Sequence, residues 1–271
     1  MLHLFVIKAL QQAFNLTQTQ KSSRRAVIVL IAAAYNEYGF QDAYQTANVI
    51  KDNGIAIIVI NYVSTNGVLT TSLQNISSPG YYYNSNLDGL YDSRISYALT
   101  QLNCFCPPGN LQFQIYNTAW ENFTNYGDCF YSFNGDTNPI QAERACRLES
   151  GVLAALNNQQ KLDFITDYLL PYSLKGKKKF TVGFHKSANL NNTWNWWDYD
   201  GSEYSLGDFP LLSDIPTPED NYGYMWNHYG FKWILTTGNS VSLPYICQIK
   251  ACDASFICDQ DNFKKFEKHH L

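Results

Sequence analysis

The sequence predicts two successive folded parts, a partial α/β segment over residues 1–103 and an α+β domain over residues 104–250, followed by a tail at 251–271. Two observations support this division. The first hundred or so residues contain two continuous apolar runs with a helical pattern between them, which is typical of a parallel sheet. All seven cysteines and all six tryptophans lie beyond residue 103, which indicates a second domain that is rich in loops and cross-linked by disulfides.

The first segment follows a strand–helix–strand pattern. The runs Ala26–Ala33 and Ile55–Val63 are apolar and partly β-branched, as expected of buried parallel strands. Between them, Asp42–Asp52 has apolar residues at helical spacing and predicts a right-handed crossover helix. Further helices are expected at Leu2–Phe14 and Leu87–Leu102. Because two strands make too small a sheet to be stable, we expect upstream strands and interpret the chain as truncated at its N-terminus.

The second segment is expected to alternate short strands with two helices around one long loop. The helices are predicted at Pro139–Arg147 and Asn157–Leu170. The region Lys186–Asn227 shows little periodicity and predicts an extended ordered loop, and such loops often carry function. The expected strands are Phe113–Tyr116, Cys129–Phe133, Phe180–Phe184, Phe231–Leu235 and Pro244–Gln248.

The composition favours a recognition protein. Aromatic residues make up 15% of the chain, with 20 Tyr and 6 Trp, and rigid aromatic surfaces suit binding as well as packing. The formal net charge of −4 argues against nucleic acid as a partner, because nucleic-acid binding needs a basic surface. The longest apolar run, Ala26–Tyr35, is too short to cross a bilayer, so no transmembrane segment is expected.

The cysteines favour disulfides and an oxidising compartment over a zinc site. Their clustering in one half of the chain is typical of a disulfide framework. The spacings of Cys104-x-Cys106 and of the later pair Cys252 and Cys258 differ from those of zinc knuckles. An odd number of cysteines leaves one thiol that is free, intermolecular or paired outside this sequence. The cysteines are Cys104, Cys106, Cys129, Cys146, Cys247, Cys252 and Cys258.

N-glycosylation sequons also point to the secretory route. No signal peptide is evident, because Lys8 interrupts the apolar stretch Met1–Phe14. We nevertheless expect an extracellular, secreted glycoprotein whose beginning is missing from this sequence. The sequons begin at Asn15, Asn75, Asn122 and Asn191.

Cysteines, tryptophans and apolar strands recur in a fixed order through the second segment. They are Trp120, Cys129-Phe130, Ala142, Cys146, Leu153-Ala-Ala-Leu156, Phe180-Thr-Val-Gly-Phe184, Trp194-x-Trp196, Asp200-Gly201, Trp233 and Pro244-Tyr-Ile-Cys247. In order and spacing they resemble the C-type lectin-like domain over Cys104–Ile249, with the Thr-Val-Gly-Phe stretch corresponding to that family's core strand.

This resemblance implies two helices flanking two small sheets, and it implies a cysteine pairing. Cys146 would bridge to Cys247, and Cys106 to Cys129, while Cys252 and Cys258 are also assigned to disulfides. A bridge that closes a loop of about a hundred residues contributes about 4–5 kcal/mol by constraining the unfolded chain.

The first segment resembles the C-terminal part of a von Willebrand factor A domain, which has a Rossmann-like fold. The resemblance rests on the strand Val27-Ile-Val-Leu-Ile31, the helix Asp42–Lys51 and the run Asn53-Gly-Ile-Ala-Ile-Ile-Val-Ile60. The combination resembles secreted proteins that carry an A domain before a lectin-like domain. The Asp-x-Ser-x-Ser motif of the family's metal site is absent from the sequence, so metal-dependent adhesion through this segment is not expected.

Sugar-binding members of the lectin family hold calcium through a Glu-Pro-Asn or Gln-Pro-Asp triplet and a later Trp-Asn-Asp triplet, whose oxygens suit calcium. This sequence has Asp208-Phe-Pro210 and Pro218-Glu-Asp-Asn221 in the long loop, and Ile234-Leu235 after Trp233. We therefore expect no cofactor and interpret the acidic residues as part of a solvated loop. The alternative is a rearranged calcium site that would use Asp214, Glu219, Asp220 or Asn221.

Several aromatic and polar side chains are candidates for ligand contacts. Trp194, Trp196 and Trp197 either stack on sugar rings or belong to the core, and the resemblance favours the core. His228, beside Trp226, either lines a binding surface or is a satisfied loop residue. The predicted ligand-binding residues are Asp208, Glu219, Asn221, Trp226 and Lys232.

No motif in the sequence indicates catalysis. None of the five histidines sits in a His-Glu-x-x-His motif, no Gly-x-Ser-x-Gly elbow is present, and His185 is interpreted as structural or surface. We predict a non-enzymatic extracellular recognition module that binds a carbohydrate or protein ligand through the lectin-like domain. The alternative is a structural or protein-interaction protein that binds no sugar. Host defence, or innate immunity, is what the resemblance implies in general terms.

Overall fold

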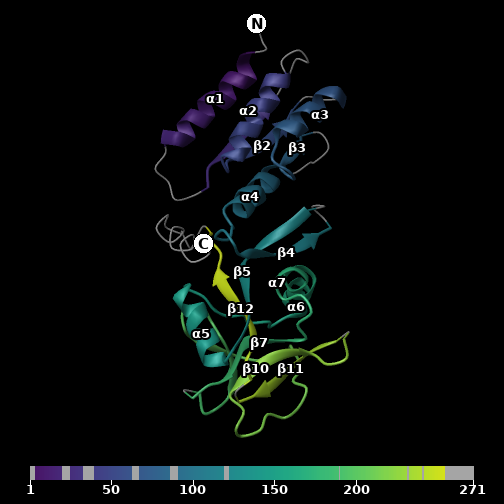
Figure 1. Ribbon diagram of the computed structural model, residues 1–271. Helices are drawn as coiled ribbons and strands as arrows, with labels where there is room; N and C mark the ends of the chain where they lie inside the picture. Colours follow the sequence, from purple (N-terminus) through teal and green to yellow (C-terminus); the bar gives the residue numbers. More distant parts are fainter. Residues whose placement is uncertain are drawn as a thin grey trace. The chain divides into compact units, whose positions relative to one another are not determined.

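The chain folds into two compact units that divide between Cys104 and Phe105. The structure is a computed structural model that describes residues 4–19, 25–32, 40–62, 67–85, 91–118, 122–188, 190–230, 232–239 and 241–253 (Figure 1). The boundary lies one residue from the predicted one. The second unit continues to Cys252, two residues beyond the predicted end, because a β-bridge joins Cys252 to Phe105. The rest of the predicted tail, from residue 254, lies outside the described residues.

The first unit is built on a three-stranded parallel sheet. The strands β1 (Val27–Ala32), β2 (Ala56–Asn61) and β3 (Tyr82–Asn84) lie in the order β1-β2-β3. All six residues of β2 are buried. A strand with two hydrogen-bonded neighbours and both faces covered must be apolar at nearly every position, which is what its sequence shows.

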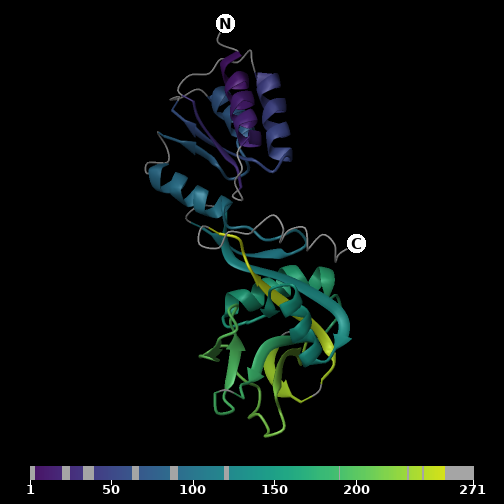
Figure 2. The same ribbon diagram turned by 90° about the vertical axis from the view of Figure 1, so that its left-hand side faces the viewer.

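Helices cover both faces of this sheet. Leu10 of α1 (Leu4–Thr19), Ala47 of α2 (Phe40–Asp52) and Leu73 of α3 (Gly67–Ile76) pack against one face, together with Ile57 and Val59 of β2. Figure 2 shows α1 and α2 side by side on that face. The opposite face packs against Ala98 and Leu102 of α4 (Tyr91–Leu102).

The expected strands and crossover helix of the first unit are present, but the prediction of only two strands was wrong. The structure adds α3 and β3. β3 has three residues, Tyr82–Asn84, and follows a turn at Ser78–Tyr81. So short a segment has too few residues to show a strand's alternation of apolar and polar positions.

The second unit contains a nine-stranded sheet assembly in which β12 is central. The main path runs in the order β11-β10-β7-β12-β5-β4, while β6 pairs with β12, and β8 pairs with both β7 and β9. The strands are β4 (Leu111–Asn117), β5 (Asn122–Thr137), β6 (Val152–Leu153), β7 (Lys179–Lys186), β8 (Trp194–Trp197), β9 (Glu203–Ser205), β10 (Tyr222–Asn227), β11 (Trp233–Gly238) and β12 (Leu243–Lys250).

Two helical segments pack against the strands. Helix α5 (Pro139–Leu148) begins with Pro139 after the cap Asn138, whose side chain accepts a hydrogen bond from the backbone N–H of Gln141. The second segment is α6 (Gln159–Phe164), a π-helical turn (Ile165–Leu169) and α7 (Leu170–Ser173) in succession. One continuous helix was expected here. In the structure the backbone hydrogen bonds change from α-helical to π-helical spacing over the residues that precede Pro171.

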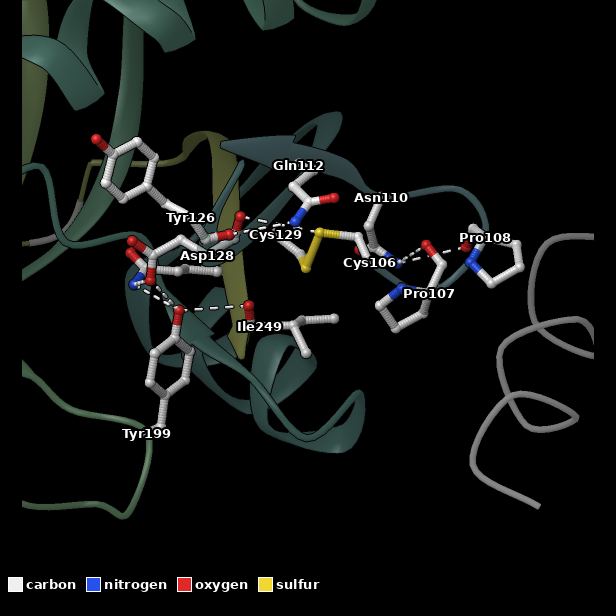
Figure 3. The surroundings of a disulfide bond; sticks show 11 residues. Cys106, Pro107, Pro108, Asn110, Gln112, Tyr126, Asp128, Cys129, Tyr199 and Ile249 are labelled. Atoms are coloured by element: carbon white, nitrogen blue, oxygen red, sulfur yellow. Dashed lines mark hydrogen bonds between the residues drawn. A yellow bond between two sulfur atoms is a disulfide. The ribbon is translucent and has the colours of Figure 1, made fainter. Parts of the chain in front are cut away.

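The two disulfides implied by the resemblance are present. Cys146 of α5 bonds to Cys247 of β12, and Cys106 bonds to Cys129 of β5 (Figure 3). Cys252 is also disulfide-bonded, and its expected partner Cys258 lies outside the described residues.

The long region expected to be a loop contains three strands, β8, β9 and β10, so that expectation was wrong. In β10 the inward positions include Gly223, and a Cβ atom there would lie 2.7 Å from Cβ of Phe184. Glycine is required because the neighbouring strand leaves no room for a side chain. A strand whose inward position is glycine does not show the usual apolar alternation.

Candidate functional site

A groove of about 1000 Å³ is the candidate site of the second unit. Three segments line it: residues 159–166 of α6 and the π-helical turn, the loop 208–214, and residues 226–229 and 232–234 of the hairpin β10–β11. Its volume lies at the upper end of the range of about 300–1000 Å³ that is usual for small-molecule sites.

The loop 208–214 is fixed to the sheet. Leu212 forms a β-bridge with Leu235 of β11, and the backbone N–H of Ser213 donates to the carbonyl oxygen of Leu235 at 2.9 Å. Phe209 and Leu212 pack against the main core, and Pro210 is buried. Leu211, between two anchored residues, is instead 80% exposed. The loop therefore holds an aliphatic side chain at the rim of the groove.

The β10–β11 hairpin forms one side of the groove, and its two tryptophan side chains already have contacts within the protein. Lys179 Nζ lies 4.3 Å from the ring centroid of Trp226, and the ring of His228 makes an edge contact with Trp226 at 4.0 Å between centroids. Trp233 packs on Phe180 of the core at 5.2 Å between centroids. Tyr229, at the hairpin tip, is 68% exposed. His228 and Tyr229 are thus exposed to solvent, whereas the two indoles are only partly exposed.

Carboxylates outnumber cationic side chains along the groove. Asp163, Asp208 and Asp214 line it, against Lys232. The side chain of Gln159 donates to Asp163 Oδ1 at 2.6 Å. In the part of the chain that the structure describes, Asp208, Asp214 and Lys232 have no ion-pair or hydrogen-bond partner for their side chains. These charges are therefore available to a ligand.

The structure brings together some of the residues predicted from the sequence and separates others. Asp208, Trp226 and Lys232 line the groove, as does Asp214, a candidate for the alternative calcium site. Glu219 and Asn221 are not among the lining residues and precede β10, whereas Trp226 lies near its far end. Five residues of extended strand span about 16 Å, so the predicted residues do not form one cluster.

Asp220 and Asn221 have structural partners instead. Asp220 Oδ2 accepts hydrogen bonds from the backbone N–H of Thr217 at 2.9 Å and from Thr237 Oγ1 at 2.8 Å. Burial alone would raise the pKa of Asp220, but these hydrogen bonds and the nearby Lys186 together lower that pKa below its ordinary value. The side-chain amide of Asn221 donates to the Glu219 carbonyl and to Asn239 Oδ1, both at 2.9 Å.

Several groove residues were not identified from the sequence. Asp163, Leu211 and Tyr229 all line the groove. The signal for Leu211 was the apolar run Phe209-Pro-Leu-Leu212 inside an otherwise polar loop, since such a run needs either burial or a partner. No comparable signal marks Asp163, because its place in the groove depends on tertiary packing.

Comparison with known proteins finds a family model that matches most of this unit. Residues 137–249 match the family model described as the Lectin C-type domain. The matched region contains α5, the core strand β7 and the Cys146–Cys247 disulfide. Residues 137–249 form a C-type lectin-like domain. From here on the second unit is called the lectin-like domain.

The chain is similar to a curated protein over most of its length, and about half of it is similar to solved structures. C-type lectin domain-containing protein 160 of Caenorhabditis elegans is 26% identical over 269 residues, which cover 92% of this chain and 40% of that relative. The mouse scavenger receptor C-type lectin carbohydrate-recognition domain is 16% identical, covers 54% of this chain and 96% of its own, and gives a TM-score of 0.37. The calcium-independent C-type lectin SPL-2 from Saxidomus purpuratus is 18% identical, with coverages of 53% and 93% and a TM-score of 0.40.

The donor set of the lectin-like domain does not fit the family's calcium site. The residues that follow Trp233 are Ile234, which lines the groove, and Leu235, which is fully buried in the core. Neither side chain has an oxygen, and calcium needs several oxygen ligands. Among the described residues, no group of three or more His, Cys, Asp or Glu side chains is placed to hold a metal ion.

The tryptophans of β8 and the buried histidine belong to the interior of the lectin-like domain. Trp196 is fully buried, and Trp194 stacks on Phe184 at 5.0 Å between ring centroids. His185 is buried in β7, stacks on Trp197 at 3.9 Å, and places Nε2 3.4 Å from Oε2 of Glu203. These residues do not line the groove, so the structural interpretation of His185 holds in this fold.

A largely buried polar network joins β5, through Asp128, to the long loop region. Tyr199 donates to Asp128 Oδ1 at 2.6 Å (Figure 3). Lys161 Nζ lies 2.9 Å from Asp128 Oδ2. The side-chain amide of Gln248 donates to Asp128 Oδ1 at 2.8 Å, and its oxygen accepts from the backbone N–H of Ala155 at 3.0 Å. Burial and the Asp128 charge raise the pKa of Tyr199, so this hydroxyl stays protonated and acts as a donor.

The predicted glycosylation sites differ in exposure. Asn15, Asn75 and Asn191 are exposed, and Asn191 lies in a turn with φ of 52°. Asn122 is only half-exposed, and its side-chain oxygen accepts from the backbone N–H of Phe123 at 2.8 Å. No helix among the described residues is both long and apolar enough to span a membrane.

Proposed function

We propose that this chain is a non-enzymatic, extracellular recognition protein whose lectin-like domain binds a carbohydrate or protein ligand in the groove without calcium. The observation that carries the proposal is the groove itself. It is open, it is lined by apolar and aromatic side chains, and it holds the unpaired charges of Asp208, Asp214 and Lys232. Two disulfides within the lectin-like domain support an oxidising compartment.

Independence from calcium is supported by Ile234 and Leu235, which give no oxygen at the position of the family's later triplet. The remaining candidate ligands do not assemble elsewhere, because Asp220 is bonded to Thr217 and Thr237 while Asp214 lies in the groove. Asp208, Trp226 and Lys232 are the proposed ligand contacts that the sequence also indicated.

The test uses the full chain, produced by secretion so that its disulfides form. It is applied to a glycan array and to immobilised extracellular proteins, with excess calcium and with excess chelator. We expect the same ligands to be bound in both conditions, and we expect Lys232→Ala to weaken binding. Glu219→Gln serves as the matched control, because Glu219 is exposed but does not line the groove. Binding that disappears with chelator would contradict the calcium-independent mechanism.

We also propose that the first unit is the C-terminal part of a von Willebrand factor A-like domain. Its parallel order β1-β2-β3, with helices on both faces, supports this. An experimental structure of the full chain tests it, because a different strand order in the first unit would contradict the assignment.

A further inference from the structure

The groove of the lectin-like domain combines exposed aliphatic side chains with uncompensated negative charge. This combination bears on the chemistry of the ligand, which the proposed function leaves open. We infer that the occupant is an extended segment of another protein that presents a Lys or Arg side chain next to an apolar one. The inference rests on the proposed function, since it assigns a ligand class to the same site.

The first step concerns the rim of the groove. Leu211 is 80% exposed although the residues on either side of it are anchored, and Ile215, next to the lining residue Asp214, is 92% exposed. Aliphatic side chains held in water by a fixed loop gain free energy when an apolar partner covers them. The hydroxyls of a saccharide would instead lose hydrogen bonds to water against these side chains.

The second step concerns the aromatic rings. A sugar ring is usually held by stacking on an open aromatic face. In the groove, the Trp226 ring already has the Lys179 ammonium group at 4.3 Å and the His228 ring at 4.0 Å, and Trp233 packs on Phe180. A saccharide that stacks on Trp226 or Trp233 would have to displace these contacts. An apolar side chain of a peptide can instead pack on Leu211, which lines the same groove and needs no open ring face.

The third step concerns charge. Asp208 and Asp214 have no partner among the described residues, and Asp163 adds a third carboxylate, whereas Lys232 is the one lysine or arginine among the lining residues. Like charges along one groove favour a ligand of opposite charge and disfavour an acidic one. A Lys or Arg side chain of the partner would meet the two unpaired aspartates, and Lys232 would donate a hydrogen bond to a backbone carbonyl or to a carboxylate of the partner.

The probe is a library of random peptides displayed on phage, selected against the full chain with its disulfides intact. We expect enriched peptides that carry Lys or Arg within two or three positions of Leu, Ile, Phe or Met. Asp208→Asn combined with Asp214→Asn should weaken the binding of a synthetic enriched peptide about three- to tenfold at low salt, and raised salt should narrow that difference. Leu211→Ser should weaken it about tenfold.

Matched controls are available on the same domain. Leu148, at the end of α5, is 85% exposed and outside the groove, so Leu148→Ser should leave peptide binding unchanged. Glu219→Gln removes an exposed carboxylate outside the groove and should also leave it unchanged. Enrichment of acidic peptides, or equal losses in Leu148→Ser and Leu211→Ser, would overturn the inference.

The result also separates this inference from the proposed function. If no basic-apolar peptide is enriched, but glycan binding occurs and is lost in Lys232→Ala, the groove is a ligand site and the peptide assignment is wrong. If neither peptides nor glycans nor extracellular proteins bind in a way that the groove substitutions change, both the assignment and the proposed function fall.

Discussion

The central strands of the two units, β2 and β12, each have six consecutive buried residues, but these residues are held in different ways. In β2 five of the six are Ala, Ile or Val, packed between α1–α3 on one face and α4 on the other. In β12 the buried run contains Cys247, bonded to α5, and Gln248, whose amide has partners on three different segments. The first unit is therefore stabilised mainly by apolar area, and the lectin-like domain by specific pairwise bonds as well.

This difference has a consequence for substitutions. An aliphatic core tolerates the loss of a methyl group with partial relaxation of its neighbours. A buried hydrogen-bonding group cannot be replaced so easily, because its former partners remain buried without a bond. Substitutions of similar size in β2 and β12 should therefore lower the free energy of unfolding by different amounts.

The largest effect is expected from removal of the Cys146–Cys247 disulfide. Replacing both cysteines with serine should lower the free energy of unfolding of the lectin-like domain by about 4 kcal/mol, because the bridge closes a loop with a sequence separation of 101 residues. Tryptophan fluorescence during urea unfolding measures this selectively, since all six tryptophans lie beyond residue 119, in the part of the chain that forms this domain.

The first unit gives the internal control for that experiment. Hydrogen exchange of β2 amides, measured in the same variant by mass spectrometry, should stay as slow as in the unmodified chain. Equal acceleration in β2 and β12 would show that the two units do not unfold independently.

The next effect compares the two central strands directly. Gln248→Leu should lower the free energy of unfolding of the lectin-like domain by about 3 kcal/mol, because it leaves the Ala155 N–H without its acceptor and removes two donated bonds at Asp128 and Tyr199. The measurement is again the urea midpoint from tryptophan fluorescence.

Its matched partner is Ile58→Val in β2, where the side chain is fully buried. Loss of one methyl group there should cost about 1 kcal/mol in the first unit, measured by hydrogen exchange of β2. If Gln248→Leu and Ile58→Val lower the free energy of unfolding of their units by the same amount, the proposed difference between the two cores is wrong.

The same contrast explains which elements the sequence could predict. β1 and β2 were predicted because their buried residues form continuous apolar runs, a signal that needs no knowledge of partners. β10 was missed because one of its inward positions is Gly223, required by the close approach of Phe184 from β7. That requirement exists only in three dimensions.

The candidate site shows the same limit. Asp208, Trp226 and Lys232 were predicted as binding residues, and they lie in one groove because the loop 208–214 bonds back onto β11. Glu219 and Asn221 have the same residue chemistry and lie close by in the sequence, yet β10 separates them from Trp226. The residue types indicated the chemistry of the candidate site, but the course of β10 determines which of the predicted residues lie in the groove.

The smallest effect concerns Asp220, which two hydrogen bonds hold between the long loop and β11. Its pKa is lowered in the folded state from an ordinary value of 3.8, so the folded protein favours the ionised carboxylate more than the unfolded chain does. The stability contributed by Asp220 is therefore fully present above that ordinary value, and it is lost as the pH falls through the lower folded-state pKa.

Asp220→Asn should lower the free energy of unfolding of the lectin-like domain by about 1 kcal/mol at neutral pH, because its hydrogen bonds are weakened. The cost should shrink below pH 3.8, because the protonated carboxyl of the unmodified chain no longer differs in charge from the amide. Urea midpoints from tryptophan fluorescence, compared between the two chains at neutral and acid pH, give both values. A cost that does not change with pH would mean that Asp220 acts through packing, as the aliphatic residues of β2 do.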